Sequence, residues 1–104
     1  MLYAEGWRQR VEQNATLDLV RRVPLGSYAN PVVTVAIRSD GTVEEIKFDR
    51  SSGSVQVDQA VRQINLQFAP YARFAPDLAL DYDVLEIRRT WTFNTAVRLF
   101  APDP

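Results

Sequence analysis

Asp81, Asp83 and Glu86 form the densest acidic cluster in the chain and are its most obvious candidates for chemistry. Paired carboxylates can cleave glycosidic bonds, and clustered carboxylates can bind calcium. The segment lacks the glycine-interrupted acidic loop of a calcium-binding hand, and a chain of 104 residues has little room for a sugar-binding cleft. We therefore expect the three carboxylates to be solvated, in a loop and at the start of a strand.

Cysteine and histidine are both missing from the sequence. Without them there is no Ser-His-Asp triad, no thiolate nucleophile, no iron–sulfur cluster and no ordinary zinc or haem site. The single lysine, Lys47, has Glu45 and Asp49 as neighbours on its own side of a predicted strand, which favours a surface charge over a catalytic amine. We expect no catalytic residue, no metal ion and no cofactor.

Two arginine pairs, Arg21-Arg22 and Arg88-Arg89, lie in a chain with several aromatic residues and raise the question of nucleic-acid binding. A sheet that binds RNA carries aromatic side chains on its central strands, whereas the first predicted strand offers only Val, Thr, Ala and Ile besides a terminal arginine. Twelve basic and 13 acidic residues give a net charge of −1, which provides no field to attract a polyanion. The sequence therefore argues against a nucleic-acid partner.

The elements that must position these residues follow from hydrophobic periodicity. Alternating apolar residues predict strands, and the apolar stripe that begins at Val57 predicts an amphipathic helix. Gly41 can take the positive φ of a hairpin turn, and a bulge at Glu44-Glu45 would reconcile the return strand with its alternation. In chain order we expect a helix at 3–14, a short second helix at 17–23 ended by Pro24, strands at 32–38 and 43–50, a helix at 55–68, a long loop at 69–82 and a strand at 84–93.

This order predicts a small α+β sandwich, in which a three-stranded antiparallel or mixed sheet of order 2-1-3 is covered on one face by helices. We expect one domain at 1–104, with N-terminal helices at 1–24, a core at 32–93 and a tail or short edge strand at 94–104. No apolar run approaches the ~20 residues of a membrane span. The sequence is thus that of a cytosolic protein or of a soluble piece of a longer one.

Trp91 and Arg89 lie on the apolar side of the last strand. We expect Trp91 to be buried, with a partner for its indole N–H. Arg89 is unusual at such a position, and we expect it to reach past the helix to Asp58 or Asp49 in a structural ion pair. One edge of this strand is either covered by residues 94–100 or free to accept an extended peptide, and geometry leaves both open.

Four short motifs in fixed order resemble the TonB C-terminal domain family. They are Ser-Asp-Gly-Thr-Val at 39–43, Ser-Ser-Gly at 51–53, Val-Asp-Gln-Ala at 57–60 and Ile-Arg-Arg-Thr-Trp-Thr-Phe at 87–93. The resemblance implies the periplasmic domain of an energy transducer that is anchored in the inner membrane. It also implies two partners, an N-terminal segment of an outer-membrane transporter and, through an absent N-terminal part, a proton-driven inner-membrane complex.

The resemblance further implies that the transporter segment docks by strand addition to the last strand and that force is transmitted through this contact. Many members carry a Tyr-Pro pair in a region that also meets the transporter, where this chain has Leu17-Asp18. A TolA-like adaptor, or a module that pairs with its own copy as a homodimer, therefore stays an alternative. The expected partner-binding residues are Glu86, Ile87, Arg88, Arg89, Thr90, Trp91, Thr92 and Phe93, together with Leu17 and Asp18.

Overall fold

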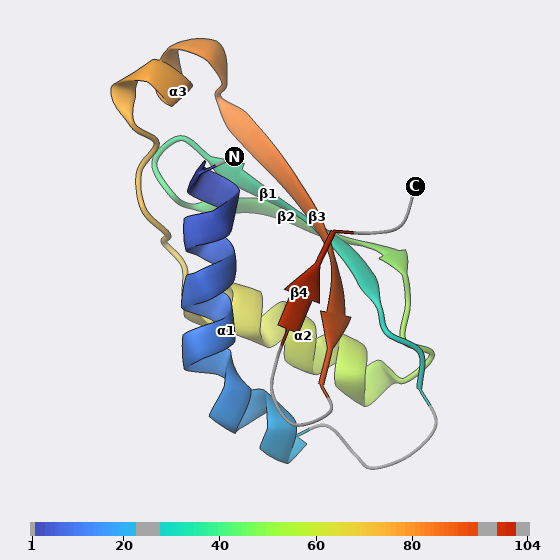
Figure 1. Cartoon of the computed structure of the whole chain (residues 1–104). Coiled ribbons are helices and arrows are strands. Elements are labelled where there is room, and N and C mark those ends of the chain that lie inside the picture. The colour runs from blue at the N-terminus through green and yellow to red at the C-terminus, as the bar shows by residue number, and fades with distance from the viewer. Residues whose placement is uncertain (1, 23–27, 94–97, 102–104) are drawn as a thin grey trace.

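The computed structural model describes residues 2–22, 28–93 and 98–101 and has an α+β fold (Figure 1). Pro24 and residues 94–97 lie outside this part of the chain. The elements are α1 (Leu2–Arg22), β1 (Val32–Arg38), β2 (Val43–Arg50), α2 (Val55–Gln67), α3 (Pro76–Asp81), β3 (Val84–Thr92) and β4 (Arg98–Phe100).

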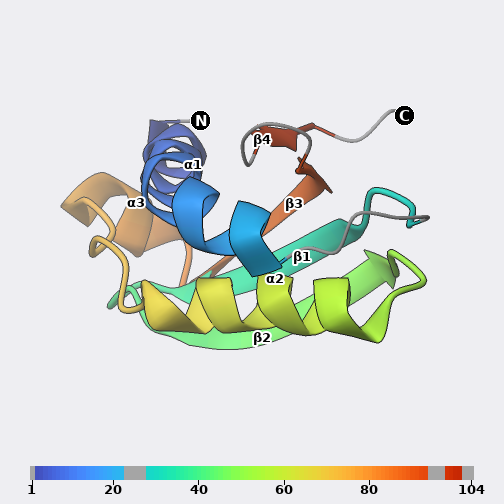
Figure 2. The ribbon, with the colours of Figure 1, turned by 90° about the horizontal axis from the view of Figure 1, so that it is seen from below.

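The strands form one sheet in the order β2-β1-β3-β4, and each neighbouring pair is antiparallel. The expected 2-1-3 order is confirmed for the first three strands, but the sheet has four strands, the fourth being the short edge strand that was one of two alternatives for residues 94–104. Buried residues of α1 and α2 share one hydrophobic cluster with β1 and β3, so both helices cover the same face (Figure 2). On the opposite face, β2 and β3 carry exposed charged residues such as Lys47, Glu86 and Arg88, whereas β1 places the buried Val32 and Ala36 there.

The hairpin between β1 and β2 is built by local turn chemistry. Gly41 has φ +90°, and the Asp40 carboxylate accepts hydrogen bonds from the backbone N–H of Thr42 at 3.0 Å and from its hydroxyl at 2.6 Å. Ala36 pairs with Glu45 and Ile37 pairs with Val43, so one residue of β2 is extra at this point. The bulge predicted at Glu44-Glu45 is therefore confirmed.

α1 is one continuous helix of 21 residues, so the predicted break between residues 14 and 17 is wrong. Asn14 and Thr16 are weak helix formers, but neither forbids helical backbone as proline does. The next proline along the chain is Pro24, and the helix ends two residues before it. The low helix propensity of these two residues therefore does not interrupt the helix.

The predicted loop at 69–82 contains a short helix, α3, which has Pro76 in its first turn. Tyr71 and Phe74, which precede α3, are buried. Their backbone N–H groups also donate to the hairpin, Tyr71 to the Gly41 carbonyl at 2.7 Å and Phe74 to the Ser39 carbonyl at 2.9 Å. These bonds fix the loop against the end of the β1–β2 hairpin.

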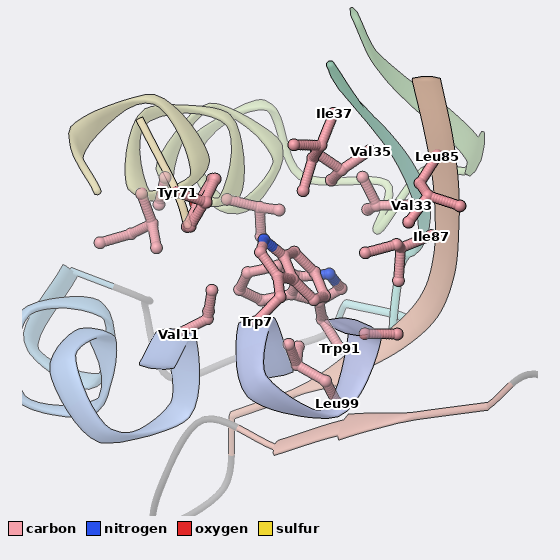
Figure 3. Close-up of a cluster of buried hydrophobic side chains, with 14 of the residues drawn as sticks. Trp7, Val11, Val33, Val35, Ile37, Tyr71, Leu85, Ile87, Trp91 and Leu99 are labelled. Carbon is pink, nitrogen blue, oxygen red and sulfur yellow. The ribbon is translucent and has the colours of Figure 1, made fainter. Parts of the chain in front are cut away.

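The core lies between the helices and the sheet. Figure 3 shows Trp7 and Val11 of α1 facing Trp91 of β3 and Leu99 of β4. Trp91 has no exposed surface, as expected, but its indole N–H finds no hydrogen-bond partner within the described residues. The predicted partner for this group is thus not seen there.

Candidate functional site

The direction of backbone groups along β3 follows from two hydrogen bonds at its ends. Ser39 donates to the Asp83 carbonyl at 2.9 Å, and Trp91 donates to the Pro31 carbonyl at 3.0 Å. Antiparallel ladders alternate between hydrogen-bonded and non-hydrogen-bonded pairs, and β1 and β3 keep one register over seven pairs. Odd-numbered residues of β3 therefore bond to β1. The residues whose N–H and C=O groups point away from β1 are Val84, Glu86, Arg88, Thr90 and Thr92.

β4 covers only the C-terminal end of this outer edge. Its pairs with β3 are Thr90 with Phe100, Trp91 with Leu99, and Thr92 with Arg98. The outward groups of Thr90 and Thr92 thus already face a strand. Within the described residues no strand pairs with the outer side of residues 84–88, which leaves this stretch as an open edge.

The predicted binding residues on β3 divide between its two faces. Ile87, Trp91 and Phe93 are buried beneath the helices. Glu86 and Arg88 are exposed on the opposite face, where the Arg88 guanidinium pairs with the Asp49 carboxylate at 3.5 Å. An added strand would therefore meet backbone groups first, with exposed charges on one face of the sheet and apolar side chains on the other.

The structure places the other two predicted residues, Leu17 and Asp18, in the C-terminal part of α1. This end of the helix lies away from the beginning of β3 (Figure 1). The fold therefore does not bring these positions to the open edge at residues 84–88.

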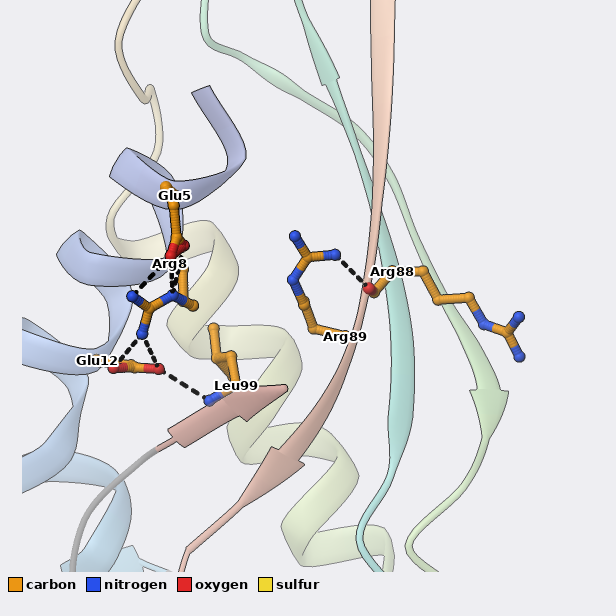
Figure 4. Close-up of polar contacts among 6 residues, drawn as sticks. All are labelled: Glu5, Arg8, Glu12, Arg88, Arg89 and Leu99. Atoms are coloured by element: carbon orange, nitrogen blue, oxygen red, sulfur yellow. Dashed lines mark hydrogen bonds and ion pairs between the residues drawn. The ribbon is translucent and has the colours of Figure 1, made fainter. Parts of the chain in front are cut away.

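Arg89 forms neither of the two ion pairs expected for it, so that prediction is wrong. Its Nη1 donates to the backbone carbonyl of Arg88 at 2.7 Å (Figure 4). Asp49 pairs with Arg88 instead, and Asp58 accepts hydrogen bonds from Ser52 through its hydroxyl at 2.6 Å and its backbone N–H at 3.0 Å. Arg89 thus covers an outward carbonyl of the open edge.

A second charged contact covers the outer edge of β4. The Glu12 carboxylate of α1 accepts the backbone N–H of Leu99 at 3.0 Å, and Arg8 links it to Glu5 with contacts of 2.9 Å and 2.8 Å (Figure 4). The hydrogen bond from Arg8 is the main cause that lowers the pKa of Glu5. Sequence reasoning missed this contact, since it joins residues 87 positions apart. The one available signal was the spacing of Glu5, Arg8 and Glu12 along one helix face.

The opposite edge of the sheet is irregular. β2 shows two register shifts against β1, and such bulges disturb the ladder that a new strand would extend. Arg62 of α2 also donates to the Ile46 carbonyl at 3.3 Å and lies over the Phe48 ring, 5.2 Å from its centroid. Of β2 and the part of β3 that β4 leaves uncovered, β3 is the strand that offers a regular open stretch.

A groove of about 780 Å³ lies between α1 and the segment before and within α3. Trp7, Arg10, Tyr71 and Leu78 are among its lining residues. Burial raises the pKa of Tyr71 to about 12, so its hydroxyl stays protonated and donates to the Asn65 carbonyl at 2.8 Å. This groove therefore holds no ionised tyrosine that could act as a base or nucleophile near neutral pH.

The three acidic residues considered for catalysis or calcium binding lie at the surface. Asp81, Asp83 and Glu86 are all exposed, as expected. Within residues 2–22, 28–93 and 98–101 no three carboxylates come together in a way that could hold a metal ion. In the same ranges, no helix is both long enough and apolar enough to cross a bilayer.

Fold and edge together define a small α+β domain whose distinctive surface is a partly open strand. The model of the family described as TonB C terminal matches residues 3–72, which include most of α1 and all of β1, β2 and α2. The chain therefore belongs to the TonB C-terminal family. No curated protein and no solved structure gave a match.

Proposed function

We propose that this chain is the partner-binding domain of a TonB-like energy transducer and that it docks an extended segment of an outer-membrane transporter on the edge of β3. The observation that carries the proposal is the regular, open stretch at residues 84–88 beside the part of β3 that β4 covers. Family membership supplies the kind of partner, and the edge supplies the means of binding it.

Val84, Glu86 and Arg88 each present one donor and one acceptor to an incoming strand. Five residues of strand span about 16 Å, the length of a short peptide segment. Each hydrogen bond at such an edge contributes a net ~0.5–1.5 kcal/mol, from which the cost of association must be subtracted. The proposed complex is accordingly one of modest affinity, suited to repeated engagement and release.

Strand addition also suits the transmission of force. A segment pulled along the direction of β3 would load its backbone hydrogen bonds together, and β3 is itself held by its long ladder to β1. In this proposal the domain works in the periplasm, and an N-terminal part of the full protein anchors it in the inner membrane beside a proton-driven complex. The domain itself acts by binding and catalyses no reaction.

The same open edge favours a second candidate, a structural adaptor of the cell envelope that pairs with its own copy. Residues 84–88 of two copies could pair antiparallel across a two-fold axis. A TolA-like partner is a further form of this alternative, because Leu17-Asp18 replaces the Tyr-Pro pair of many family members. Concentration-dependent mass in sedimentation velocity would favour the self-pairing module, and a constant monomer mass would count against it.

The docking proposal is tested by titrating the ¹⁵N-labelled domain with synthetic 20-residue peptides. The peptides should copy the N-terminal segments of outer-membrane transporters from the same genome, with scrambled versions as controls. We expect at least one native peptide to shift the amide signals of Val84, Glu86 and Arg88. Shifts confined to residues 77–83, or to the groove beside α1, would contradict docking at this edge.

A further inference from the structure

The open edge is not equally free along its length, because one of its acceptors is already occupied. Arg89 Nη1 donates to the Arg88 carbonyl at 2.7 Å, and this carbonyl points away from β1. Hydrogen bonds from a charged donor are stronger than those between neutral groups. A strand that docks on residues 84–88 would need the same oxygen for its own backbone N–H.

We infer that Arg89 guards the docking edge, holding the Arg88 carbonyl in the free domain and giving it up only to a strand that replaces the bond. This inference rests on the proposed function, since it concerns access to the same edge. It makes Arg89 an intramolecular competitor that weakens every edge partner. The cost is the same for every strand that takes this oxygen, so short or poorly matched strands, a second copy among them, are the first to lose measurable binding.

The position of Arg89 fits this role. Its side chain lies on the α1 side of β3, whereas Arg88 extends to the opposite face (Figure 4). Arg89 also acts on Glu5 of α1. A hydrogen bond from Arg8 is the main cause that lowers the pKa of Glu5, and the positive charge of Arg89 lowers this pKa further. The Glu5 carboxylate already pairs with Arg8 at 2.8 Å, so it is less available to the guanidinium of Arg89. The guanidinium of Arg89 donates to the edge instead.

An arginine away from the edge supplies a matched control. Arg50→Ala removes an exposed guanidinium of equal charge from β2, yet keeps the bond from Arg89 to the Arg88 carbonyl. Arg89→Ala removes the guard itself. Arg89→Met keeps an apolar stem of similar length without any donor, and it separates loss of the hydrogen bond from loss of packing.

The first readout needs no partner. Guanidinium protons held in a hydrogen bond exchange more slowly with water than free ones, so in NMR spectra of the free domain we expect slower exchange for Arg89 than for the exposed Arg50 of β2. Equal exchange rates would show that the guard is open in solution and would overturn the inference, whatever binds to the edge.

The second readout is the Kd of the native transporter peptide that binds most tightly. We expect Arg89→Ala and Arg89→Met to tighten binding by about three- to tenfold, the value of one exposed hydrogen bond, and Arg50→Ala to leave it within about twofold. Unchanged or weaker binding of both Arg89 variants, with the wild type still binding, would overturn the guard alone. Failure of every peptide to bind wild type and variants alike would overturn the proposed function.

Discussion

Proline at position 86 separates the two sides of β3 most sharply. The N–H of Glu86 points away from β1, so Glu86→Pro removes a donor that the β1–β3 ladder does not use. Proline is tolerated in edge strands when its missing N–H faces solvent. We therefore expect the variant to fold but to lose affinity for an added strand.

The loss follows from the hydrogen bond that the variant cannot make. Docking forfeits a net ~0.5–1.5 kcal/mol for the bond, and the facing carbonyl of the incoming strand is left unpaired at a further cost of about 1–3 kcal/mol. A combined loss of about 2–4 kcal/mol corresponds to a roughly 30- to 1000-fold increase in Kd. Glu86→Ala keeps the N–H and should change Kd by about twofold at most, as exposed substitutions usually do.

Ile87→Pro is the matched change on the inner side of the strand. Its N–H bonds toward β1 and its side chain is buried, so we expect a loss of stability above about 4 kcal/mol. Calorimetric titration with the tightest native peptide measures binding, and urea unfolding followed by circular dichroism measures stability. A folded Glu86→Pro variant that binds as tightly as the wild type would refute the reasoning.

Four further predictions concern the scaffold. Gly41→Ala should destabilise the domain by about 2–5 kcal/mol in urea unfolding, because Gly41 has φ +90° and a Cβ there would lie 2.0 Å from the backbone oxygen of Tyr71. Gly6→Ala should stabilise the domain by about 0.5–1 kcal/mol, because Gly6 lies in α1 and a Cβ there would meet nothing within 4 Å. Glu12→Gln should weaken the contact between α1 and β4 by about 1–2 kcal/mol, seen as faster amide exchange at Leu99. The pKa of Asp58 is lowered because, against the effect of burial, hydrogen bonds from two nearby serines stabilise its carboxylate. Its contribution is therefore complete above the unfolded pKa of about 4 and is lost as pH falls through the folded value, so Asp58→Asn should cost about 1–2 kcal/mol at pH 7 and progressively less as the pH falls below about 4 in urea titrations.

The sequence predicts those features of the fold that have a local cause. Alternation in β1 and the stripe that begins at Val57 reflect burial of one face, so strand and helix follow from spacing alone. Gly41 marks the hairpin because the turn needs its positive φ. β4 has three residues, too few for any period to show, and its existence depends on pairing with β3.

The candidate site is harder to predict because its properties come from contacts between distant segments. The sequence places the docking edge on β3 and extends it to Thr90 and Thr92, whose outward groups β4 already meets. Arg89 was expected to pair with a carboxylate, yet its guanidinium donates to the backbone carbonyl of the preceding residue. Side-chain direction at an edge is decided by which neighbours leave space, and spacing in sequence does not contain that information.

The central claim is that a partner segment becomes an additional strand beside residues 84–88. Amide hydrogen exchange of the domain with and without the tightest native peptide tests this most directly. The account predicts new protection at Val84, Glu86 and Arg88, with little change at Leu85 and Ile87, whose amides already bond to β1. Protection that ignores this alternation, or that arises only in the groove between α1 and residues 71–78, would contradict it.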